Sequence, residues 1–540
     1  MKQTAVSEVL ERLGEPFAAG FMRDPDATMV ERFANALNTW ARVLPLRPYD
    51  GGLLYPSGPK YWNPEGMAVG WYYVTATPLD RGVFEKKLAA SNPEEREALA
   101  ELERVWSAHV FPGGYTHSIP HYERVLREGL NGFDERVRKG LQTALSERDS
   151  RAGFFRAMET TLDTARILHR RIVEEIERFV PGDDEQRGNR DALLAALRVV
   201  PFRPAERFFD ALVATNFTFY FDGCDDLGRF DQYLRPYFER SLAEGELSHD
   251  RAVELVRAQW ENVNAATAWN AAIGGTKPDG TDLSSELTIV CIEAARGMRR
   301  PNLALRLGPS TPDSVWEAAL DTIVSGCGLP ALYWDPNYYR AMDASGIPLP
   351  VKERHEYAFG GCTELMVQGR SNVGSLDDDI NVPGVLERSL HGRLPTAADF
   401  PEFREGFRND LAATIASIVE RVNLWQQQKA EWQPQPIRSL LIDDCVDRGI
   451  EYSAGGARYN WSVINVMAWR MRSTHSQRSE HSYSRNAASP AGKSSTCLRG
   501  ISMARRSCGG SSRTRRDTGM AIPRLIPSRT ICHSSSSRSF

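Results

Sequence analysis

The composition of this 540-residue chain changes abruptly after Met467, and the change limits how much of the chain can fold. The last 73 residues contain 18 Ser, 13 Arg and one Lys but only two acidic residues, a net charge of +12. Such a segment cannot bury enough apolar surface to form a core. We therefore expect one folded domain over residues 1–467 and a disordered Ser/Arg-rich tail over residues 468–540.

The sequence gives little support for a nucleic-acid or membrane partner. A basic tail can contact RNA phosphates, but this tail has no regular repeat, no interleaved aromatic residues and no RNA-binding motif. The first residues, "MKQTAVSEVLERLGEP", contain no apolar targeting segment, and no apolar run reaches membrane-spanning length. We therefore expect a cytoplasmic protein that binds neither nucleic acid nor membrane.

The cysteines of the chain do not follow a metal-binding or disulfide pattern. All eight are widely spaced, and no CxxC motif occurs. We therefore expect no metal site and no disulfide framework.

Hydrophobic periodicity separates a helical first part from a mixed second part. A stripe at helical spacing runs through Met158, Leu162, Ala165, Leu168, Ile172, Ile176 and Phe179. From about residue 300 a strand pattern, "NLALRL", is followed by a helix start at Thr311 and Pro312 and by a short apolar run, "LPALYWD". This alternation predicts a β/α barrel or a doubly wound sheet, with helices over about 1–210 and the barrel part over about 211–467.

The stretch "GGCTELM" places Cys362 two residues before Glu364. A carboxylate beside a thiol disfavours the thiolate, whereas nucleophilic cysteines lie near cations or helix N-termini. In an extended finger the two side chains face the same way, roughly 6.5–7 Å apart along the backbone. The pair therefore predicts chemistry other than ordinary thiolate attack, on a small substrate held between the two groups.

Four segments resemble, in order, the glycyl radical enzymes of the pyruvate formate-lyase superfamily. They are "LGRFDQYLRPYFERSLAEGELSHDRAVELVRAQW", "IGGTKPDGTDLSSELTIVCIEAAR", "YAFGGCTELMVQG" and "LLIDDCVDRGIEYSAGGARYNWSVINVM". "HYERVLREGL" looks like the N-terminal helical region of the same family. The resemblance implies a ten-stranded β/α barrel with a helical N-terminal region and two finger loops inside. The barrel of this chain would be incomplete at its C-terminus.

The resemblance stops where the composition changes. After "INVM" the family continues with a run similar to "GLANVADSLAAI", but this chain reads "AWRMRSTHSQRS". A reading frame shifted by one base permits "GLANAVDSLAAI" at the same place. We therefore interpret residues 468–540 as out of frame. None of their glycines, including Gly509, Gly510 and Gly519, stands in the "RVxGY" context of the family's radical glycine.

The resemblance also implies a chemistry for the cysteine and the glutamate. In this family an activase that uses S-adenosylmethionine and an iron–sulfur cluster installs a glycyl radical, and the protein binds no separate cofactor. Cys362 would pass a hydrogen atom between that glycine and the substrate. Glu364 would take a proton from the neighbouring hydroxyl or ammonium-bearing carbon. The alternative from the residues alone is a buried small cysteine and a surface glutamate.

The motif around Cys362 narrows the type of reaction. Pyruvate formate-lyase proper uses two adjacent cysteines, whereas Cys362 is flanked by Gly361 and Thr363, so formate C-acetyltransferase-like activity is the less favoured alternative. The Cys-x-Glu motif resembles the one in the dehydratases, lyases and decarboxylases of the family. We therefore expect cleavage of a C–O, C–N, C–S or C–C bond in a small polar substrate.

Three further residues are candidates for substrate binding. Asp231, within "GRFDQY", matches an aspartate that orients substrate in several relatives, with a capping or salt-bridging acid as the alternative. Cys224 lies nearest the position where dehydratases place a substrate-facing Tyr or His, in a loop that is one residue shorter here. His117 lies in a polar loop at the expected substrate entrance. The dehydratase aspartate fourteen places after the cysteine is replaced by Leu376.

The sequence thus predicts a homologue of glycyl radical lyases and dehydratases that is inactive as given, because the radical glycine is missing. Its expected partners are a small-molecule substrate, a radical S-adenosylmethionine activase and a second copy in a homodimer. The competing interpretation is a catalytically dead barrel retained for a binding or regulatory role.

Overall fold

The computed structural model describes residues 3–60, 66–70, 79–106, 115–347 and 349–467. The expected disordered tail and the frame change after Met467 lie outside these residues and stay predictions. Residues 1–380 and 415–465 form one compact unit, and residues 381–414 belong to a second. The proposed domain boundary at residue 467 is not tested by this division and also stays a prediction.

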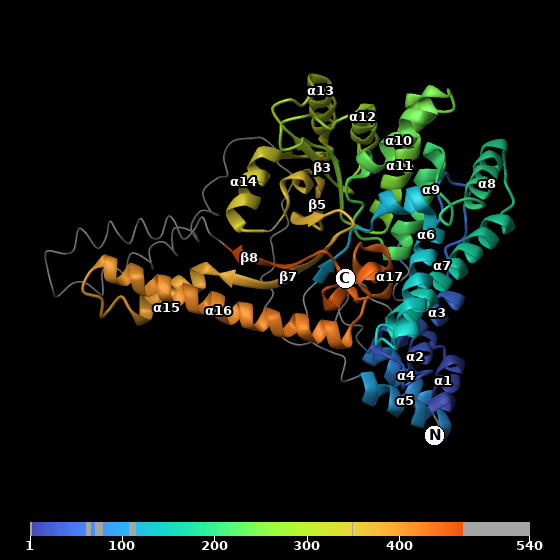
Figure 1. Cartoon of the computed structure of the whole chain (residues 1–540), viewed down its shortest axis with the longest axis horizontal. Helices are drawn as coiled ribbons and strands as arrows, with labels where there is room; N and C mark the ends of the chain where they lie inside the picture. Colours follow the sequence, from blue (N-terminus) through green and yellow to red (C-terminus); the bar gives the residue numbers. More distant parts are fainter. Residues whose placement is uncertain (1–2, 61–65, 71–78, 107–114, 348, 468–540) are drawn as a thin grey trace, which may run out of the picture. The chain divides into compact units, whose positions relative to one another are not determined.

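The N-terminal half of the first unit is helical, as the sequence predicts (Figure 1). Helix α7 buries the apolar stripe from Met158 to Ile176 against α3 and α6, and Phe179 caps its end. The helices are α1 (Gln3–Arg12), α2 (Pro16–Met22), α3 (Met29–Val43), α4 (Arg81–Ala90), α5 (Pro93–Trp106), α6 (Tyr122–Glu147), α7 (Ala152–Arg178), α8 (Asp184–Leu197) and α9 (Phe208–Asp222).

The end of α9 starts the loop that leads to the site. Every residue of α9 except the half-buried Phe209 is buried, and the helix ends at Gly223, whose φ of 115° suits a residue without a Cβ. Cys224 also has a positive φ, 54°, which is uncommon for a residue that is not glycine. The loop over residues 223–229 then leads into α10 (Phe230–Ala243) and α11 (His249–Ala265).

Alternating strands and helices follow, as the sequence predicts. β2 (Asn270–Gly274), β3 (Asn302–Leu307) and β4 (Ala331–Trp334) form a parallel sheet in sequential order. The connecting helices are α12 (Glu286–Ala294) and α13 (Asp313–Thr322), and α14 (Asp335–Ser345) follows β4. The predicted cap of α13 is shifted, because Pro312 occupies the N-cap while the Thr311 hydroxyl accepts the Gly308 amide at 2.9 Å.

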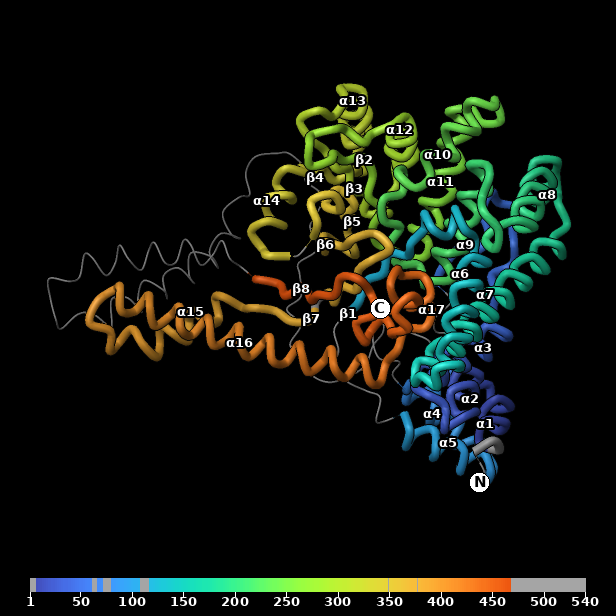
Figure 2. Tube along the Cα trace, viewed as in Figure 1, coloured from blue at the N-terminus to red at the C-terminus, as the bar shows by residue number. Residues whose placement is uncertain are grey.

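The cysteine segment is a short antiparallel hairpin of β5 (Tyr357–Gly360) and β6 (Glu364–Val367). In the traces of Figure 2, this hairpin lies beside the sheet of β2, β3 and β4. The base of the hairpin is held by the buried Arg306, which donates to the Tyr357 carbonyl at 2.8 Å and pairs with Asp335 at 3.0 Å.

A second sheet has the order β1 (Tyr115–His117), β7 (Ser371–Asn381) and β8 (Tyr459–Met467), in which β1 and β7 are antiparallel. The remaining helices are α15 (Val382–Gly392), α16 (Phe400–Trp432), α17 (Pro436–Leu441) and α18 (Cys445–Arg448). The acids after Leu376 lie on β7. Buried Asp377 pairs with Lys429 of α16 at 3.2 Å, and Asp378 accepts from Arg421 of α16 at 2.8 Å.

Candidate active site

Cys362 lies in the turn at the tip of the β5–β6 hairpin, and its side chain is exposed. The turn consists of residues 361–363 and begins at Gly361, whose φ is +53°. The extended finger expected from the sequence, with Cys362 and Glu364 at alternate strand positions, is therefore wrong. The chain must reverse between β5 and β6, so Cys362 lies in the turn and Glu364 is the first residue of β6.

The Glu364 carboxylate folds back over this turn. Its Oε2 accepts the backbone amides of Cys362 at 3.0 Å and of Thr363 at 2.9 Å, and its Oε1 accepts the Ser375 hydroxyl. The Glu364 residue is only 9% exposed. The alternative of a surface glutamate therefore does not hold, and the carboxylate is fixed beside the backbone of the cysteine itself.

Two groups outside the hairpin hold the turn in place. The Gly361 amide donates to both carboxylate oxygens of Asp226, at 3.1 Å each. Asp226 also accepts the backbone amide of Asn270 at 2.9 Å, so the turn and the start of β2 share one acid. On the other side, Asn302 Nδ2 donates to the Cys362 carbonyl at 3.0 Å.

His117 lies against the same turn, paired with two buried acids. Its Nδ1 lies 2.9 Å from Asp225 and 3.2 Å from Asp226. Burial by itself lowers the pKa of His117, but the two carboxylates outweigh it and raise the pKa to about 10. A Cβ added at Gly361 would lie 2.2 Å from His117 Nε2, so the ring packs directly on the turn. The sequence places His117 in a polar entrance loop, whereas it is 3% exposed at the end of β1.

A buried arginine completes this cluster of charged groups. Arg438 of α17 pairs with Asp225 at 3.0 Å and donates to the Thr116 carbonyl at 2.8 Å. Asp225 has a lowered pKa although burial alone raises it, because His117 and Arg438 favour its charged form. Burial and the nearby Asp225 raise the pKa of Asp226 to about 6. His117, Asp225, Asp226 and Arg438 are called the charged cluster below.

Three members of the charged cluster, His117, Asp225 and Asp226, are the group of potential metal ligands found among the described residues. The carboxylate oxygens of Asp225 and Asp226 already accept N–H groups from Gly361, Asn270, Ser118 and Arg438. One arginine and three peptide amides thus donate to these carboxylates. Such donors are typical of a hydrogen-bonded ion cluster and not of a bound cation. The expectation of no metal stays a prediction.

Cys224 lies in the loop that contacts the cysteine turn, but its own side chain does not make the contact. It is fully buried, its amide donates to the Phe219 carbonyl at 2.7 Å, and burial raises the pKa of its thiol. The neighbouring Asp225 and Asp226, which the sequence reasoning did not single out, make the contacts. The sequence feature that indicates these two residues is a pair of adjacent acids in a segment otherwise rich in apolar residues, "FDGCDDLGRF".

Asp231 lies at the opposite end of β2 from Asn270. Its Oδ2 accepts the Gly274 amide at 2.8 Å and the Thr288 hydroxyl at 2.6 Å, and burial raises its pKa. These contacts join the start of α10 to β2 and α12. The structure does not bring Asp231 to the Cys362 turn through any contact among the described residues, and its role in orienting substrate stays a prediction.

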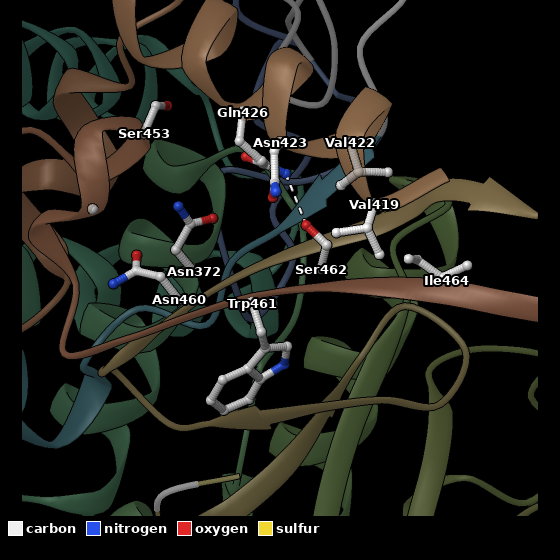
Figure 3. A pocket seen from close by; sticks show the side chains of 11 residues that line it. Asn372, Val419, Val422, Asn423, Gln426, Ser453, Asn460, Trp461, Ser462 and Ile464 are labelled. Atoms are coloured by element: carbon white, nitrogen blue, oxygen red, sulfur yellow. Dashed lines mark hydrogen bonds between the residues drawn. The ribbon is translucent and has the colours of Figure 1, made fainter. Parts of the chain in front are cut away.

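A cavity of about 340 Å³ lies elsewhere, between α16 and the strands β7 and β8 (Figure 3). Its wall combines apolar side chains with neutral polar ones, and Gln426 Nε2 donates to the Ser462 hydroxyl at 3.0 Å. The lining includes Asn372, Asn423, Gln426, Asn460 and Ser462 but neither Cys362 nor Glu364. This cavity therefore does not belong to the candidate active site.

No helix among the residues that the structure describes is long and apolar enough to cross a membrane.

The chain is similar in sequence to known proteins. Residues 84–470 match the family model described as pyruvate formate lyase-like. The trans-4-hydroxy-L-proline dehydratase of Clostridioides difficile is 25% identical over 351 residues, which cover 57% of this chain and 44% of that protein. The (2S)-3-sulfopropanediol dehydratase of Klebsiella oxytoca is 23% identical over 405 residues, which cover 66% of this chain and 49% of that protein. This chain thus spans less than half the length of these relatives.

The fold also matches solved structures. The TM-score is 0.71, at 21% identity, with a structure that describes 1,2-propanediol dehydration in Roseburia inulinivorans, and the match covers 89% of this chain and 70% of the other. The hydroxyproline dehydratase structure from Clostridioides difficile gives 0.70 at 17% identity, with 89% and 68% covered. These likenesses confirm the expected barrel fold. Because the family model covers most of the chain and includes the whole β5–β6 hairpin, this chain belongs to the pyruvate formate lyase-like family of glycyl radical enzymes.

Proposed function

We propose that this chain carries the bond-cleaving residues of a glycyl radical lyase or dehydratase that acts on a small polar substrate. The observation that carries the proposal is the contact between Glu364 Oε2 and the Cys362 amide, at 3.0 Å, within one turn. The turn has a single cysteine, since Gly361 and Thr363 flank it. A lone thiol beside a fixed carboxylate suits elimination better than acyl transfer between two thiols.

Cys362 is the hydrogen-atom donor and acceptor in this proposal. When installed by the activase, the glycyl radical of the family supplies the capacity to remove a hydrogen atom from a thiol. The sulfur of Cys362 then takes a hydrogen atom from the substrate carbon and returns it to the product carbon at the end. Because S–H and activated C–H bonds have similar strengths, both transfers are nearly balanced in energy.

Glu364 is the proton acceptor. It takes the proton of the hydroxyl or ammonium on the carbon that has lost its hydrogen atom, which helps the substituent on the next carbon to leave. In the structure the carboxylate accepts two amides and the Ser375 hydroxyl, so its position is fixed before substrate enters. The substituent leaves with the electron pair of the broken bond. The proton that Glu364 acquired then neutralises the leaving group.

The charged cluster is assigned to the same site. His117 packs on Gly361, and its raised pKa keeps the imidazolium protonated next to the turn. We assign it to binding the polar end of the substrate or the leaving group. Asp231 and Cys224 are retained as substrate-binding candidates of lower rank, because their hydrogen bonds go to Gly274, Thr288 and Phe219 instead of the turn.

We expect the 540-residue chain itself to catalyse no turnover, because no glycine among residues 468–540 has the sequence context of a radical glycine. The frame-restored protein is assigned a radical S-adenosylmethionine activase as partner and a homodimeric, cytoplasmic state.

The test uses a protein whose reading frame is restored after Met467 and which is activated without oxygen. Cys362→Ser should abolish turnover of hydroxylated and sulfonated small substrates while the glycyl radical signal in electron paramagnetic resonance remains. Glu364→Gln should keep the signal and lose most of the elimination. Appreciable turnover by the Cys362→Ser protein would remove the proposal. A barrel that binds ligand but never turns over after activation would instead support a binding or regulatory role.

A further inference from the structure

Asn270, at the start of β2, buries a carboxamide that has no hydrogen-bond partner. The residue is 1% exposed, and neither Nδ2 nor Oδ1 contacts a partner among the described residues. Leaving both polar atoms of a buried amide unpaired costs stability. Gln259 of α11 is the other described amide with both polar atoms unpaired, whereas Asn262 Nδ2 donates to Asn216 Oδ1 at 3.1 Å and to the Pro56 carbonyl at 3.2 Å.

The strand register shows which way the Asn270 side chain faces. Asn270 is paired with Asn302 in the parallel β2–β3 ladder, and register partners share a face of the sheet. Asn302 uses its side-chain amide to reach the Cys362 carbonyl at 3.0 Å. Further along the same face of β3, Arg306 donates to the Tyr357 carbonyl of the hairpin. Asn270 therefore faces the side of the sheet that the cysteine hairpin occupies.

The backbone around Asn270 places it close to the turn. Its own amide and the amide of Gly361 both donate to Oδ1 of Asp226, at 2.9 and 3.1 Å. One carboxylate oxygen thus separates the backbone of Asn270 from the residue next to Cys362. An unpaired amide at this place has the position expected of a group that contacts substrate.

We infer that Asn270 binds a hydroxyl group of the substrate beside Cys362. A carboxamide offers a donor and an acceptor side by side, and a hydroxyl can donate to Oδ1 and accept from Nδ2. A carboxylate could only accept, and an ammonium could only donate, so either would leave one polar atom of Asn270 unpaired. The inference rests on the proposed function and adds to it a residue that positions the substrate hydroxyl beside Cys362.

The experiment measures protection of Cys362 from iodoacetamide in the 540-residue protein, read by mass spectrometry of the Cys362 peptide. The probes are glycerol, 1,2-propanediol, isethionate and trans-4-hydroxy-L-proline, with L-proline as the matched compound without a hydroxyl. At least one hydroxylated probe should slow alkylation of the wild-type protein. Asn270→Leu should weaken that protection about tenfold, the effect of about one lost hydrogen bond. Asn372→Leu, in the cavity beside α16, is the matched control and should keep it.

A stability measurement separates binding from a structural role. If Asn270 is kept for substrate, Asn270→Leu removes an unpaired amide and should raise the midpoint of thermal unfolding. A structural role predicts a lower midpoint. The inference is overturned if no hydroxylated probe protects the wild-type protein, or if Asn270→Leu and wild type are protected equally. Equal protection would leave the roles of Cys362 and Glu364 intact, because those are judged by turnover in the frame-restored protein.

Discussion

Gly361 donates its backbone N–H to both oxygens of the Asp226 carboxylate, at 3.1 Å each, so an acid in the loop after α9 fixes the residue next to Cys362. Asp226→Ala should free the turn, because Gly361 and the Asn270 amide both lose their acceptor. Hydrogen exchange of the peptide that spans residues 357–367 should become faster, and Cys362 should be alkylated more rapidly.

The controls for this prediction use the same loop and another buried acid. Asp226→Asn keeps an acceptor oxygen for Gly361 and should restore most of the protection that Asp226→Ala loses. Asp231→Asn changes a buried acid that does not contact the turn, so exchange in residues 357–367 should stay as in wild type. Equal exchange in wild type and Asp226→Ala would show that other contacts hold the turn.

Gly361 should not tolerate a side chain. Gly361→Ala adds a Cβ that meets His117 Nε2 at 2.2 Å, in addition to the cost of about 1–2 kcal/mol for a left-handed residue. Gly346→Ala, with φ +70° and open space around it, carries the left-handed cost alone and is the matched control. The free energy of unfolding from denaturant titration should fall clearly further for Gly361→Ala. A similar loss in the two variants would contradict the close packing of His117 on the turn.

His117 should stabilise the fold in a pH-dependent way. Its pKa is about 10 in the folded protein, compared with about 6.5 for an exposed histidine. A raised pKa gives stabilisation that is complete below about pH 6.5 and is lost as the pH rises towards 10. The free energy of unfolding of wild type minus that of His117→Asn should therefore shrink across this range. A difference that stays constant with pH would show that His117 is neutral in the folded protein.

The interpretation of residues 468–540 as out of frame can be tested on the gene and on its protein product. Adding or deleting one base near codon 467 should open a frame that reads through to an "RVxGY"-like glycine loop. The 540-residue chain, incubated with a competent activase and S-adenosylmethionine, should give no glycyl radical doublet in electron paramagnetic resonance. A stop codon within a few dozen codons of the shifted frame, or a doublet from this chain, would show that the tail has been misinterpreted.

The sequence predicted the elements better than the contacts between them. The stripe of α7 and the alternation of β3, α13 and β4 follow from local patterns that depend on neighbours three, four or two residues apart. The barrel of the family was implied by the resemblance of four segments, because the periodicity alone also allowed a doubly wound sheet. The turn at Cys362 was missed because Cys-x-Glu reads equally well as an extended strand or as a reversal. The antiparallel pairing of β5 with β6 and the positive φ of Gly361 distinguish them, and the hydrogen bond from the Cys362 amide to Glu364 closes the turn.

Side-chain partners far apart in the chain could not be read from one sequence. Cys224 drew attention to the correct loop, but the acids that contact the turn are its neighbours Asp225 and Asp226. Which of three adjacent side chains faces the site depends on the left-handed backbone at Gly223 and Cys224. The polar neighbours of His117 favoured a loop at the substrate entrance. Its burial depends on distant partners, because Asp225 accepts the Ser118 amide and Arg438 donates to the Thr116 carbonyl.

The charged cluster also sets the order in which the molecule can be assembled. It joins His117 to Asp225 across 108 residues, Asp226 to Gly361 across 135, and Asp225 to Arg438 across 213. Contacts this distant in sequence form only after the intervening chain has been ordered, so they slow folding and come late. During synthesis the N-terminal helices can fold before the hairpin emerges, whereas the surroundings of Cys362 wait for Arg438 to leave the ribosome. We therefore expect the Cys362 thiol to be among the last groups of the described residues to reach its native position.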